Sequence, residues 1–282
     1  MLGMTQIKVV EFTDPACPFA FCAEPARLRM LWRYGDHLDW SRQMVVLSQN
    51  LEEITKRGLT TAILAGAMAN LGRLHRMPID ATERSRLAIS KPACRAVVAT
   101  RLYAPVLEST ILRALRVLTM SGHFLDDQET IDQAADSSGI SAQELQGWME
   151  TPQVEAELNA DMAAARAPSE AALQLKNKLA ATDQGWRYTC PSYRFQTDSS
   201  SLEIPGFWPP EVYDLAVANL APKLAPREKP TDVSEVLEWA AAPLATAEVA
   251  AVCAIDFDEA HQELAKVATL ESVGEDGYWT PR

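Results

Sequence analysis

The fold of this chain is decided near its N-terminus, where the sequence reads Ile7-Lys8-Val9-Val10-Glu11-Phe12-Thr13-Asp14-Pro15-Ala16-Cys17-Pro18-Phe19-Ala20. The β-branched run 7–12 predicts a short buried strand, and 13–16 predicts a turn. A helix is expected to begin near Cys17, because Pro18 suits the first helical position, and to end at Gly35. Apolar and polar residues alternate over 38–46, as in a second strand. The order strand–helix–strand predicts an α/β fold with a parallel pair of strands.

Cys17 is the residue of this stretch that could carry chemistry. Unpaired backbone N–H groups and the positive end of the helix dipole stabilise a thiolate at a helix N-terminus and lower its pKa. The thiolate is the nucleophilic form of cysteine, so an exposed Cys17 would be reactive. The alternative is a small buried residue at the end of a strand, since free cysteines are often buried. The spacing leaves both interpretations open.

Composition and charge exclude several classes of protein. The 282 residues are 48% hydrophobic and 23% charged, which is sufficient for a folded core. The net charge of −12 argues against general affinity for nucleic acid. The longest uncharged stretch lies between Arg57 and Arg73 and is too short to cross a bilayer. Lys8 falls within the first predicted strand, so we expect no signal peptide, no membrane association and a cytoplasmic protein.

The cysteines occur singly along the chain, at positions 17, 22, 94, 190 and 253. Their odd number in a long chain does not describe a disulfide scaffold. No CxxC pair is present and no histidine lies at metal-ligand spacing from a cysteine, so no metal site is expected. Apolar helical surroundings predict that Cys94 and Cys253 are inert core residues. His75 and His123 are expected at surface or helix-capping positions.

Periodicity divides the rest of the chain. Helical patterns alone occupy 58–174, and β-like sequence returns after Trp186. Residues 221–230 contain three prolines without periodicity, which is typical of a linker, and three short helical patterns follow. We therefore predict four segments: the first part of an α/β domain over 1–57, a helical insertion over 58–174, the second part of the α/β domain over 175–226, and an acidic appendage over 227–282.

The C-terminal appendage resembles a small winged-helix module, with helical patterns near 233–240, 245–253 and 257–267 and a wing hairpin at 274–279. A DNA-binding role needs a basic recognition helix. Four acidic residues of 256–263 occupy that helix and only Lys266 opposes them, so we expect no nucleic-acid partner. Residues 231–282 carry eleven acidic and two basic side chains, whereas 73–116 carry nine basic and three acidic ones. The appendage is expected to pack against the body, through this basic segment, or against a second subunit in a homodimer.

The segment 9–25 resembles the active-site region of the DsbA family of the thioredoxin superfamily. It is most similar to the FrnE-like branch, whose pattern Asp-Pro-x-Cys-Pro-Trp-Cys-Trp is followed by Glu-Pro; here the chain has Asp14-Pro15-Ala16-Cys17-Pro18-Phe19-Ala20-Phe21 and then Glu24-Pro25. The segment 188–195, Tyr-Thr-Cys-Pro-Ser-Tyr-Arg-Phe, resembles the loop that carries a cis-proline in this family. The resemblance covers about residues 6–220 and implies a thioredoxin-like fold with an inserted helical domain.

The resemblance also implies a set of site residues. Cys17 matches the nucleophilic cysteine, Pro191 matches the cis-proline that faces it, and Cys190 is the residue before that proline. Pro18, Phe19 and Pro191 are expected to contact the substrate. The aromatic residues 186, 188 and 193 could line a pocket around Cys17, but ordinary packing in the core or at its rim is the favoured interpretation for them. The basic segment 73–116 could be a solvated face or could attract an anionic thiol.

Ala20 departs from the family's pattern, because it stands where the resolving cysteine is expected. Dithiol exchange needs a second thiol to expel a mixed disulfide. A small thiol such as glutathione or mycothiol could act as a co-substrate, without any tightly bound cofactor. Cys190 could serve instead, because the residue before the cis-proline lies beside the nucleophile in this fold. Cys22 ranks below Cys190, since five residues along a helix rotate it by about 140° away from Cys17.

These observations give three hypotheses for function. The first is a thiol–disulfide or thiol-cofactor oxidoreductase of the DsbA/FrnE-like type, which acts through Cys17 on a small thiol, a disulfide or a protein. The second is a glutathione-dependent transferase or isomerase, similar to the kappa-class transferases and hydroxychromene-carboxylate isomerase, which needs no second cysteine. The third is a catalytically degenerate thioredoxin-like scaffold that binds a partner.

Overall fold

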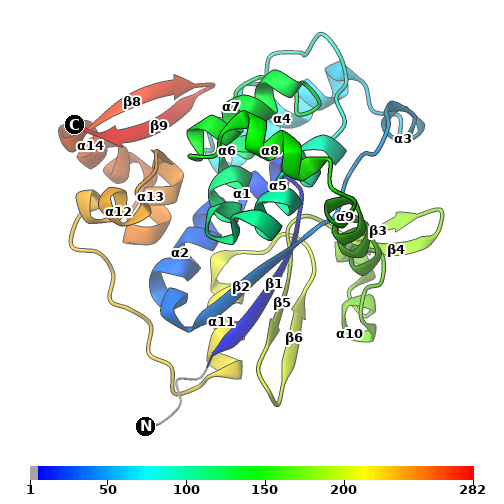
Figure 1. Ribbon diagram of the computed structural model, residues 1–282. Coiled ribbons are helices and arrows are strands. Elements are labelled where there is room, and N and C mark those ends of the chain that lie inside the picture. The colour runs from blue at the N-terminus through cyan, green and yellow to red at the C-terminus, as the bar shows by residue number, and fades with distance from the viewer. Residues whose placement is uncertain (1–5) are drawn as a thin grey trace.

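A four-stranded sheet in the order β2-β1-β5-β6 lies at the centre of the computed structural model, which describes residues 6–282 (Figure 1). The strands are β1 (Ile7–Thr13), β2 (Leu38–Met44), β5 (Ser192–Gln196) and β6 (Ser201–Ile204). β1 and β2 are parallel, whereas β5 pairs antiparallel with both β1 and β6. The predicted α/β class and the parallel pair of strands are confirmed.

Helices α1 (Pro18–Cys22) and α2 (Glu24–Tyr34) connect the two parallel strands, and a short 3-10 turn, η1 (Gly35–His37), follows. One core joins the sheet to α2 and to α11 (Pro210–Leu220). Alternate residues of β1, Ile7 and Val9, are fully buried in it against Met30 of α2 and Tyr213 of α11. β1 is thus fixed between the other strands and these helices, and the loop that follows it carries Cys17.

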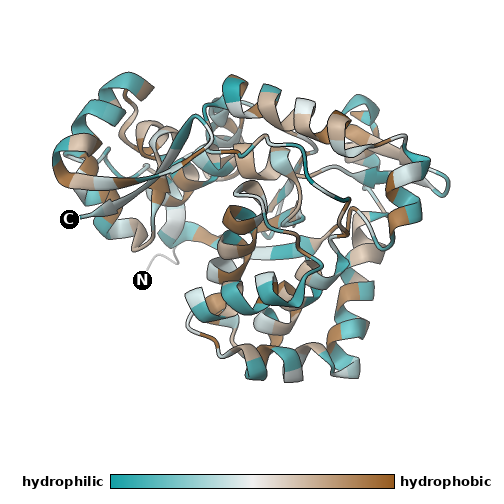
Figure 2. Cartoon of the chain, turned by 90° about the horizontal axis from the view of Figure 1, so that it is seen from above, coloured by the Kyte–Doolittle hydropathy of each residue, from teal (hydrophilic) through white to brown (hydrophobic). Residues whose placement is uncertain are grey.

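The predicted helical insertion follows β2. Its elements are α3 (Leu51–Lys56), α4 (Thr61–His75), α5 (Lys91–Tyr103), η2 (Pro105–Leu107), α6 (Glu108–Met120), α7 (Gln128–Ser137), α8 (Ala142–Met149), α9 (Pro152–Ala165) and α10 (Glu170–Leu173). Bands of hydrophobic and hydrophilic residues along these helices show their amphipathic character (Figure 2). Apolar residues of α5 to α9 form a second core. Residues 77–90, between α4 and α5, form an irregular loop that the helical prediction for 58–174 did not include.

A separate antiparallel hairpin precedes the second half of the sheet. It consists of β3 (Leu179–Thr182) and β4 (Gly185–Tyr188), after the turn η3 (Lys176–Lys178). The chain becomes extended earlier than predicted, because Leu179-Ala180-Ala181-Thr182 contains few strong strand formers and depends on its partner strand. Gly185, with φ of 114°, supplies the left-handed backbone that this tight turn requires.

The C-terminal appendage is a winged-helix-like unit, as predicted. It contains α12 (Val233–Ala240), β7 (Leu244–Ala245), α13 (Thr246–Cys253), α14 (Phe257–Val267), β8 (Ala268–Val273) and β9 (Asp276–Pro281), with the sheet order β7-β9-β8. Its core includes Leu28 and Trp32 of α2, so the unit packs directly against the α/β domain. The wing approaches the 77–90 loop closely: a Cβ atom on Gly274 would lie 2.2 Å from the carbonyl oxygen of Ile79. Figure 1 shows this unit beside α2 and α6.

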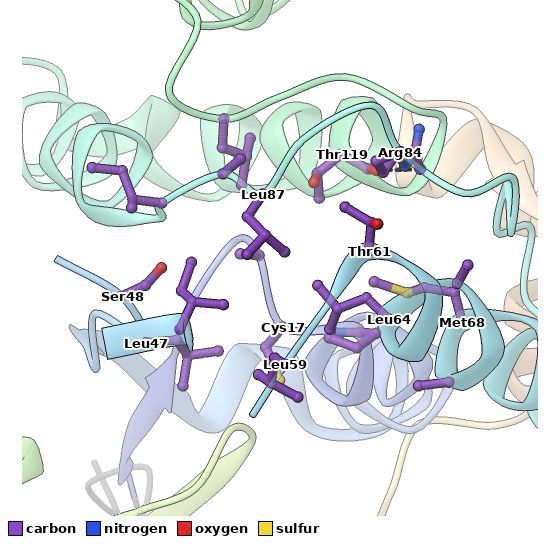
Figure 3. Close-up of a pocket in the computed structure, with 18 of the residues that line it drawn as sticks. Cys17, Leu47, Ser48, Leu59, Thr61, Leu64, Met68, Arg84, Leu87 and Thr119 are labelled. Carbon is purple, nitrogen blue, oxygen red and sulfur yellow. Dashed lines mark hydrogen bonds between the residues drawn. The ribbon is translucent and has the colours of Figure 1, made fainter. Parts of the chain in front are cut away.

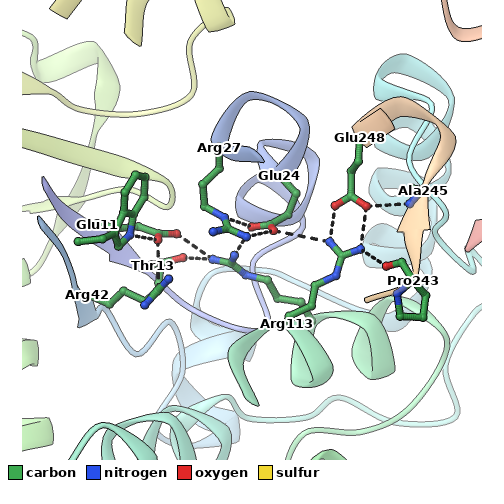
Figure 4. A network of polar contacts seen from close by, with 11 residues as sticks. Glu11, Thr13, Glu24, Arg27, Arg42, Arg113, Pro243, Ala245 and Glu248 are labelled. Atoms are coloured by element: carbon green, nitrogen blue, oxygen red, sulfur yellow. Dashed lines mark hydrogen bonds and ion pairs between the residues drawn. The ribbon is translucent and has the colours of Figure 1, made fainter. Parts of the chain in front are cut away.

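A buried ionic network joins the sheet, α2, α6 and the appendage (Figure 4). Arg116 of α6 is 1% exposed and pairs with Glu11 of β1 and Glu24 of α2. Arg113, one turn earlier, pairs with Glu24 and with the buried Glu248 of α13. The expected contact between the acidic appendage and the basic segment 73–116 is therefore present. Among residues 6–282, no helix is both long and apolar enough to cross a membrane.

Candidate active site

Cys17 lies at the N-cap of α1, just after the turn that follows β1. Its sulfur donates a hydrogen bond to the carbonyl oxygen of Cys190 at 3.3 Å. Cys190 precedes β5, and the Cys190–Pro191 peptide bond is cis. Both cysteines are free thiols. The fold thus brings together two candidate residues that are 173 positions apart in the sequence.

The surroundings of Cys17 favour its ionised form. A hydrogen bond from the Cys190 side chain, together with the backbone N–H groups of Ala20 and Phe19, lowers the pKa of Cys17 against the opposing effects of burial and of Asp14. Burial raises the pKa of Cys190 well above its usual range, and the hydrogen bond to Cys17 raises it further. Cys17 is consequently the more acidic thiol of the pair, and Cys190 the one that holds its proton more tightly. The pKa of Cys17 is thus shifted in the direction that its position at a helix N-terminus predicts.

Asp14 organises the loops behind the nucleophile. Its buried carboxylate accepts hydrogen bonds from the backbone N–H groups of Ala16 at 2.8 Å and Leu47 at 2.7 Å. It also accepts from the hydroxyl of Ser90 at 2.8 Å and from the thiol of Cys94 at 3.4 Å. The prediction that Cys94 is a core residue agrees with its full burial and strongly raised pKa, caused first by burial and then by Asp14. The role of Asp14 was not predicted, although a carboxylate between a strand and a cysteine is a visible signal in the sequence.

The backbone after β2 adopts an unusual conformation at the same place. Val46 has φ of 53°, a left-handed value that is rare for a β-branched residue. The segment is held on both sides: Val45 N donates to Thr13 O at 2.8 Å, and Arg166 donates to Val45 O at 3.0 Å. Such outliers persist where the surrounding structure over-determines the chain, often at functional sites. Here it turns Leu47 and Ser48 toward the space in front of Cys17 (Figure 3).

A cavity of about 510 Å³ opens in front of Cys17 and Cys190. Figure 3 shows its largely apolar wall, which comes from three parts of the chain: Leu47 after β2, Leu59, Leu64 and Met68 at and before α4, and Leu87 of the 77–90 loop. Cys17 itself is 5% exposed, so reagents reach it through this cavity rather than from an open surface. The volume is in the range of small-molecule sites.

The other predicted site residues separate into two groups. Pro18 and Phe19 line the cavity, and Phe19 is 48% exposed at its mouth. Pro191 is buried behind Cys190 and does not line the cavity. Cys22 lies in another core, and burial raises its pKa to about 12, in agreement with its lower rank as a partner. Of the three aromatic residues, none lines the cavity; Tyr188 instead stacks on Phe12 beneath it.

Four arginines line the cavity, and the predicted basic segment 73–116 includes two of them. Arg84 and Arg86 come from the basic segment 73–116 and line the cavity, whereas Arg113 and Arg116 of the same segment belong to the buried network. His123 also lines the cavity, although its ring is bonded to Leu118 O at 3.1 Å in a helix-ending position. Two further cavity residues, Arg57 and Arg187, lie outside the basic segment and were missed, because no periodicity links them. Within residues 6–282, no cluster of His, Cys, Asp or Glu has the arrangement of a metal site.

Comparisons with known proteins agree with this fold. No protein-family profile and no curated protein sequence matches the chain. Among solved structures, a "putative protein disulfide isomerase" from Nitrosomonas europaea has a TM-score of 0.56 at 14% identity, over 76% of this chain and 95% of that one. A "probable DsbA oxidoreductase" from Streptomyces coelicolor has 0.55 at 16% identity, over 80% and 94%. The cytosolic disulfide reductase DsbM from Pseudomonas aeruginosa has 0.50 at 12% identity, over 70% and 88%. The chain therefore has the thioredoxin-like fold of the DsbA-like oxidoreductases.

Proposed function

We propose that this protein is a thiol–disulfide oxidoreductase in which Cys17 is the nucleophile. The observation that carries the proposal is the position of Cys17, which lines a cavity of about 510 Å³ and whose sulfur lies 3.3 Å from the carbonyl oxygen of Cys190. The names of the similar structures support the same general activity. Five free cysteines support a reducing compartment, the cytoplasm.

The chemistry starts from the Cys17 thiolate. It attacks one sulfur of a disulfide substrate, a bond forms between Sγ and that sulfur, and the other sulfur leaves as a thiolate that takes a proton from water. Cys190 can then lose its proton and attack Sγ of Cys17, which forms a Cys17–Cys190 disulfide and releases the second substrate thiol. Alternatively, a small thiol such as glutathione or mycothiol attacks the mixed disulfide and regenerates Cys17. Ala20 cannot take part in either route, so the FrnE-like motif would work here with a changed resolving group.

Mass spectrometry of the protein purified without reductant tests the proposal and separates the two routes. A small-thiol adduct on Cys17 supports resolution by a co-substrate, and a Cys17–Cys190 crosslink supports internal resolution. Cys17→Ser should abolish reaction with a disulfide reagent at neutral pH, whereas the matched control Cys22→Ser should leave it unchanged. If Cys17→Ser reacts as fast as the unmodified protein, the proposal is wrong and a non-catalytic scaffold becomes the better interpretation.

The apolar cavity wall favours one second candidate, a glutathione-dependent transferase or isomerase. Leu47, Leu59, Leu64, Met68 and Leu87 offer an enclosed surface for an apolar electrophile, which a disulfide-exchange protein does not need. In this function Cys17 would assist a bound thiol rather than form a mixed disulfide. Conjugation or isomerisation assays with glutathione and aromatic electrophiles test it. Turnover that persists in Cys17→Ala would favour this candidate over the oxidoreductase.

A further inference from the structure

Two arginines of the Cys17 cavity, Arg57 and Arg187, differ from the other two in having no acidic partner. Arg84 lies beside Asp80, and Arg86 is paired with Asp126 and Asp127 at 2.8 and 2.6 Å. Neither Arg57 nor Arg187 forms an ion pair with any carboxylate within residues 6–282. Both nevertheless line the same cavity as Cys17 and Cys190. The cavity therefore carries two positive charges that the protein leaves unneutralised.

Backbone carbonyl groups hold these two guanidinium groups in place. Arg57 Nε donates to Glu53 O at 3.0 Å, and Arg187 Nη1 donates to Tyr188 O at 2.8 Å. Each guanidinium has five N–H donors in a fixed fork, so most of its donors stay available to a ligand. A carbonyl oxygen orients the group without cancelling its charge. This arrangement is what bidentate binding of a carboxylate or phosphate requires.

The charges also lie close enough to affect one another. Burial lowers the pKa of Arg57, and the charge of Arg187 lowers it further, while the nearby Glu53 and Asp14 act in the opposite direction. Burial and Arg187 have the same effect on Arg166, which donates to Val45 O at the back of the site. Arg187 also acts on Cys190, whose pKa is raised by burial and partly lowered by this arginine. Arg187 is thus close enough to Arg57 and to Cys190 for its charge to act on both.

We propose that Arg57 and Arg187 form an anion subsite, which selects small disulfides that carry a carboxylate or a similar anionic group. This inference rests on the proposed function, because the anionic group matters only as a handle that brings a disulfide to Cys17. The Cys17 thiolate forms a bond to one substrate sulfur, the substrate S–S bond breaks, and the departing thiolate is protonated by water. The apolar wall would contact the rest of the substrate while the guanidinium groups hold its anionic end.

Three disulfides of similar size test the subsite: dithiodipropionate, which is anionic, hydroxyethyl disulfide, which is neutral, and cystamine, which is cationic. The rate constant for reaction with Cys17 is measured for each at fixed pH and ionic strength, and expressed relative to the neutral disulfide. This ratio cancels any change in the fraction of Cys17 that is ionised. We expect the anionic disulfide to react about tenfold faster than the neutral one, the cationic disulfide to react more slowly, and the preference to weaken at high salt.

Variants then assign the preference to the two arginines. Arg187→Gln and Arg57→Gln should each reduce the anionic-to-neutral ratio several-fold, and Arg187→Lys should retain more of it than Arg187→Gln because it keeps the charge. Arg86→Gln is the matched control, since it removes the same charge from the cavity but its guanidinium is already occupied by Asp126 and Asp127. It should change the ratio far less.

The outcomes separate the two proposals. If the neutral disulfide fails to react with Cys17 in the folded protein, the proposed function itself is wrong. If the neutral disulfide reacts, but the three reagents have equal relative rates, the anion subsite is overturned while the proposed function stands. An anionic preference that falls equally in Arg86→Gln and Arg187→Gln also overturns the subsite, because it would then reflect only the net charge of the cavity.

Discussion

Two groups of buried polar residues lie next to each other at the end of β1. The carboxylates of the first group are paired with arginines, whereas the carboxylate of the second has only neutral hydrogen-bond donors. Glu11 and Thr13 share one face of the strand and contact Arg116, in a network where each carboxylate has guanidinium partners. Asp14, the next residue, accepts only from neutral donors, and its charge raises the pKa of both Cys17 and Cys190. Thr13 belongs to the cluster in which each carboxylate has a cationic partner, and the next residue, Asp14, belongs to the cluster in which the carboxylate has none.

The difference shows which buried charges serve the fold and which serve chemistry. A buried charge with complete partners has no reason to change its protonation state, so it holds elements together. A buried thiol pair without a cation at contact distance can ionise, react and be re-protonated. The Arg116 network joins the sheet to the insertion and the appendage, whereas the Cys17 cluster opens onto a cavity.

Removal of the central cation should have the largest effect. Arg116→Met leaves Glu11 and Glu24 buried without their main partner, and should lower the free energy of unfolding by about 3–5 kcal/mol. Lys56→Met is the control, because Lys56 and Glu52 form an exposed pair whose loss should cost less than about 1 kcal/mol. Urea unfolding of both variants measures the difference. Equal losses would show that the network is not a stabilising unit.

The contact between the appendage and the body should be next in size. Arg113→Met leaves the fully buried carboxylate of Glu248 without its cationic partner, and should lower the free energy of unfolding by about 2–3 kcal/mol. Because the Arg113–Glu248 pair is the buried ionic link between α6 and α13, the variant should also be cleaved faster by protease in the 221–230 linker. Arg76→Met removes the exposed pair with Asp258 and should leave cleavage unchanged. Cleavage that is the same in both variants would contradict the anchoring role of Arg113.

Acidification should weaken the matched cluster. The pKa of Glu24 is lowered, since the charges of Arg27 and Arg116 outweigh the effect of burial, and the pKa of Glu11 is lowered by Arg116 and Arg42 in the same way. A carboxylate whose folded pKa is depressed stabilises the protein above its unfolded pKa, near 4.3, and loses that contribution as the pH falls below it. Stability should therefore drop by about 1–3 kcal/mol between pH 5 and pH 3.

Urea midpoints at these two pH values measure the change in stability, and the loss of stability should be smaller in Arg116→Met.

Asp161 acts with the opposite sign, because burial raises its pKa to about 6. Its contribution is present at low pH and is lost as the pH rises through 6. An Asp161→Asn variant should therefore make the overall decrease on acidification steeper, and an unchanged profile would argue against this assignment.

The smallest expected change is in the reactivity of Cys17. Cys190→Ala removes the hydrogen bond that most lowers the pKa of Cys17, so the midpoint of its pH–rate profile for alkylation should move to higher pH. Cys190→Ser keeps a donor and should move it less. Asp14→Asn removes a negative charge that opposes ionisation and should move the midpoint to lower pH. A profile that is insensitive to all three variants would show that the thiol environment does not control Cys17.

Local sequence was enough to predict the elements that present the nucleophile. β-branched residues before Cys17, Pro18 at the helix start and Gly35 at its end predict strand, turn and helix, because propensity and capping act between near neighbours. The single helix predicted up to Gly35 is in fact divided at Ala23 into α1 and α2. The three helices of the appendage and the 221–230 linker were predicted for the same reason. The strand β3 was missed, since its short alanine-rich sequence is extended only through pairing with β4.

The amino-acid order by itself thus determined where Cys17 lies and that a helix begins there, because these are properties of consecutive residues. Only the tertiary structure decided which groups surround it. The carbonyl of Cys190, the cavity wall of α4 and the 77–90 loop, and the unpaired Arg57 and Arg187 come from distant parts of the chain. The burial of these groups and the distances between their charges depend on how distant segments pack together, which a pattern of neighbouring residues does not determine.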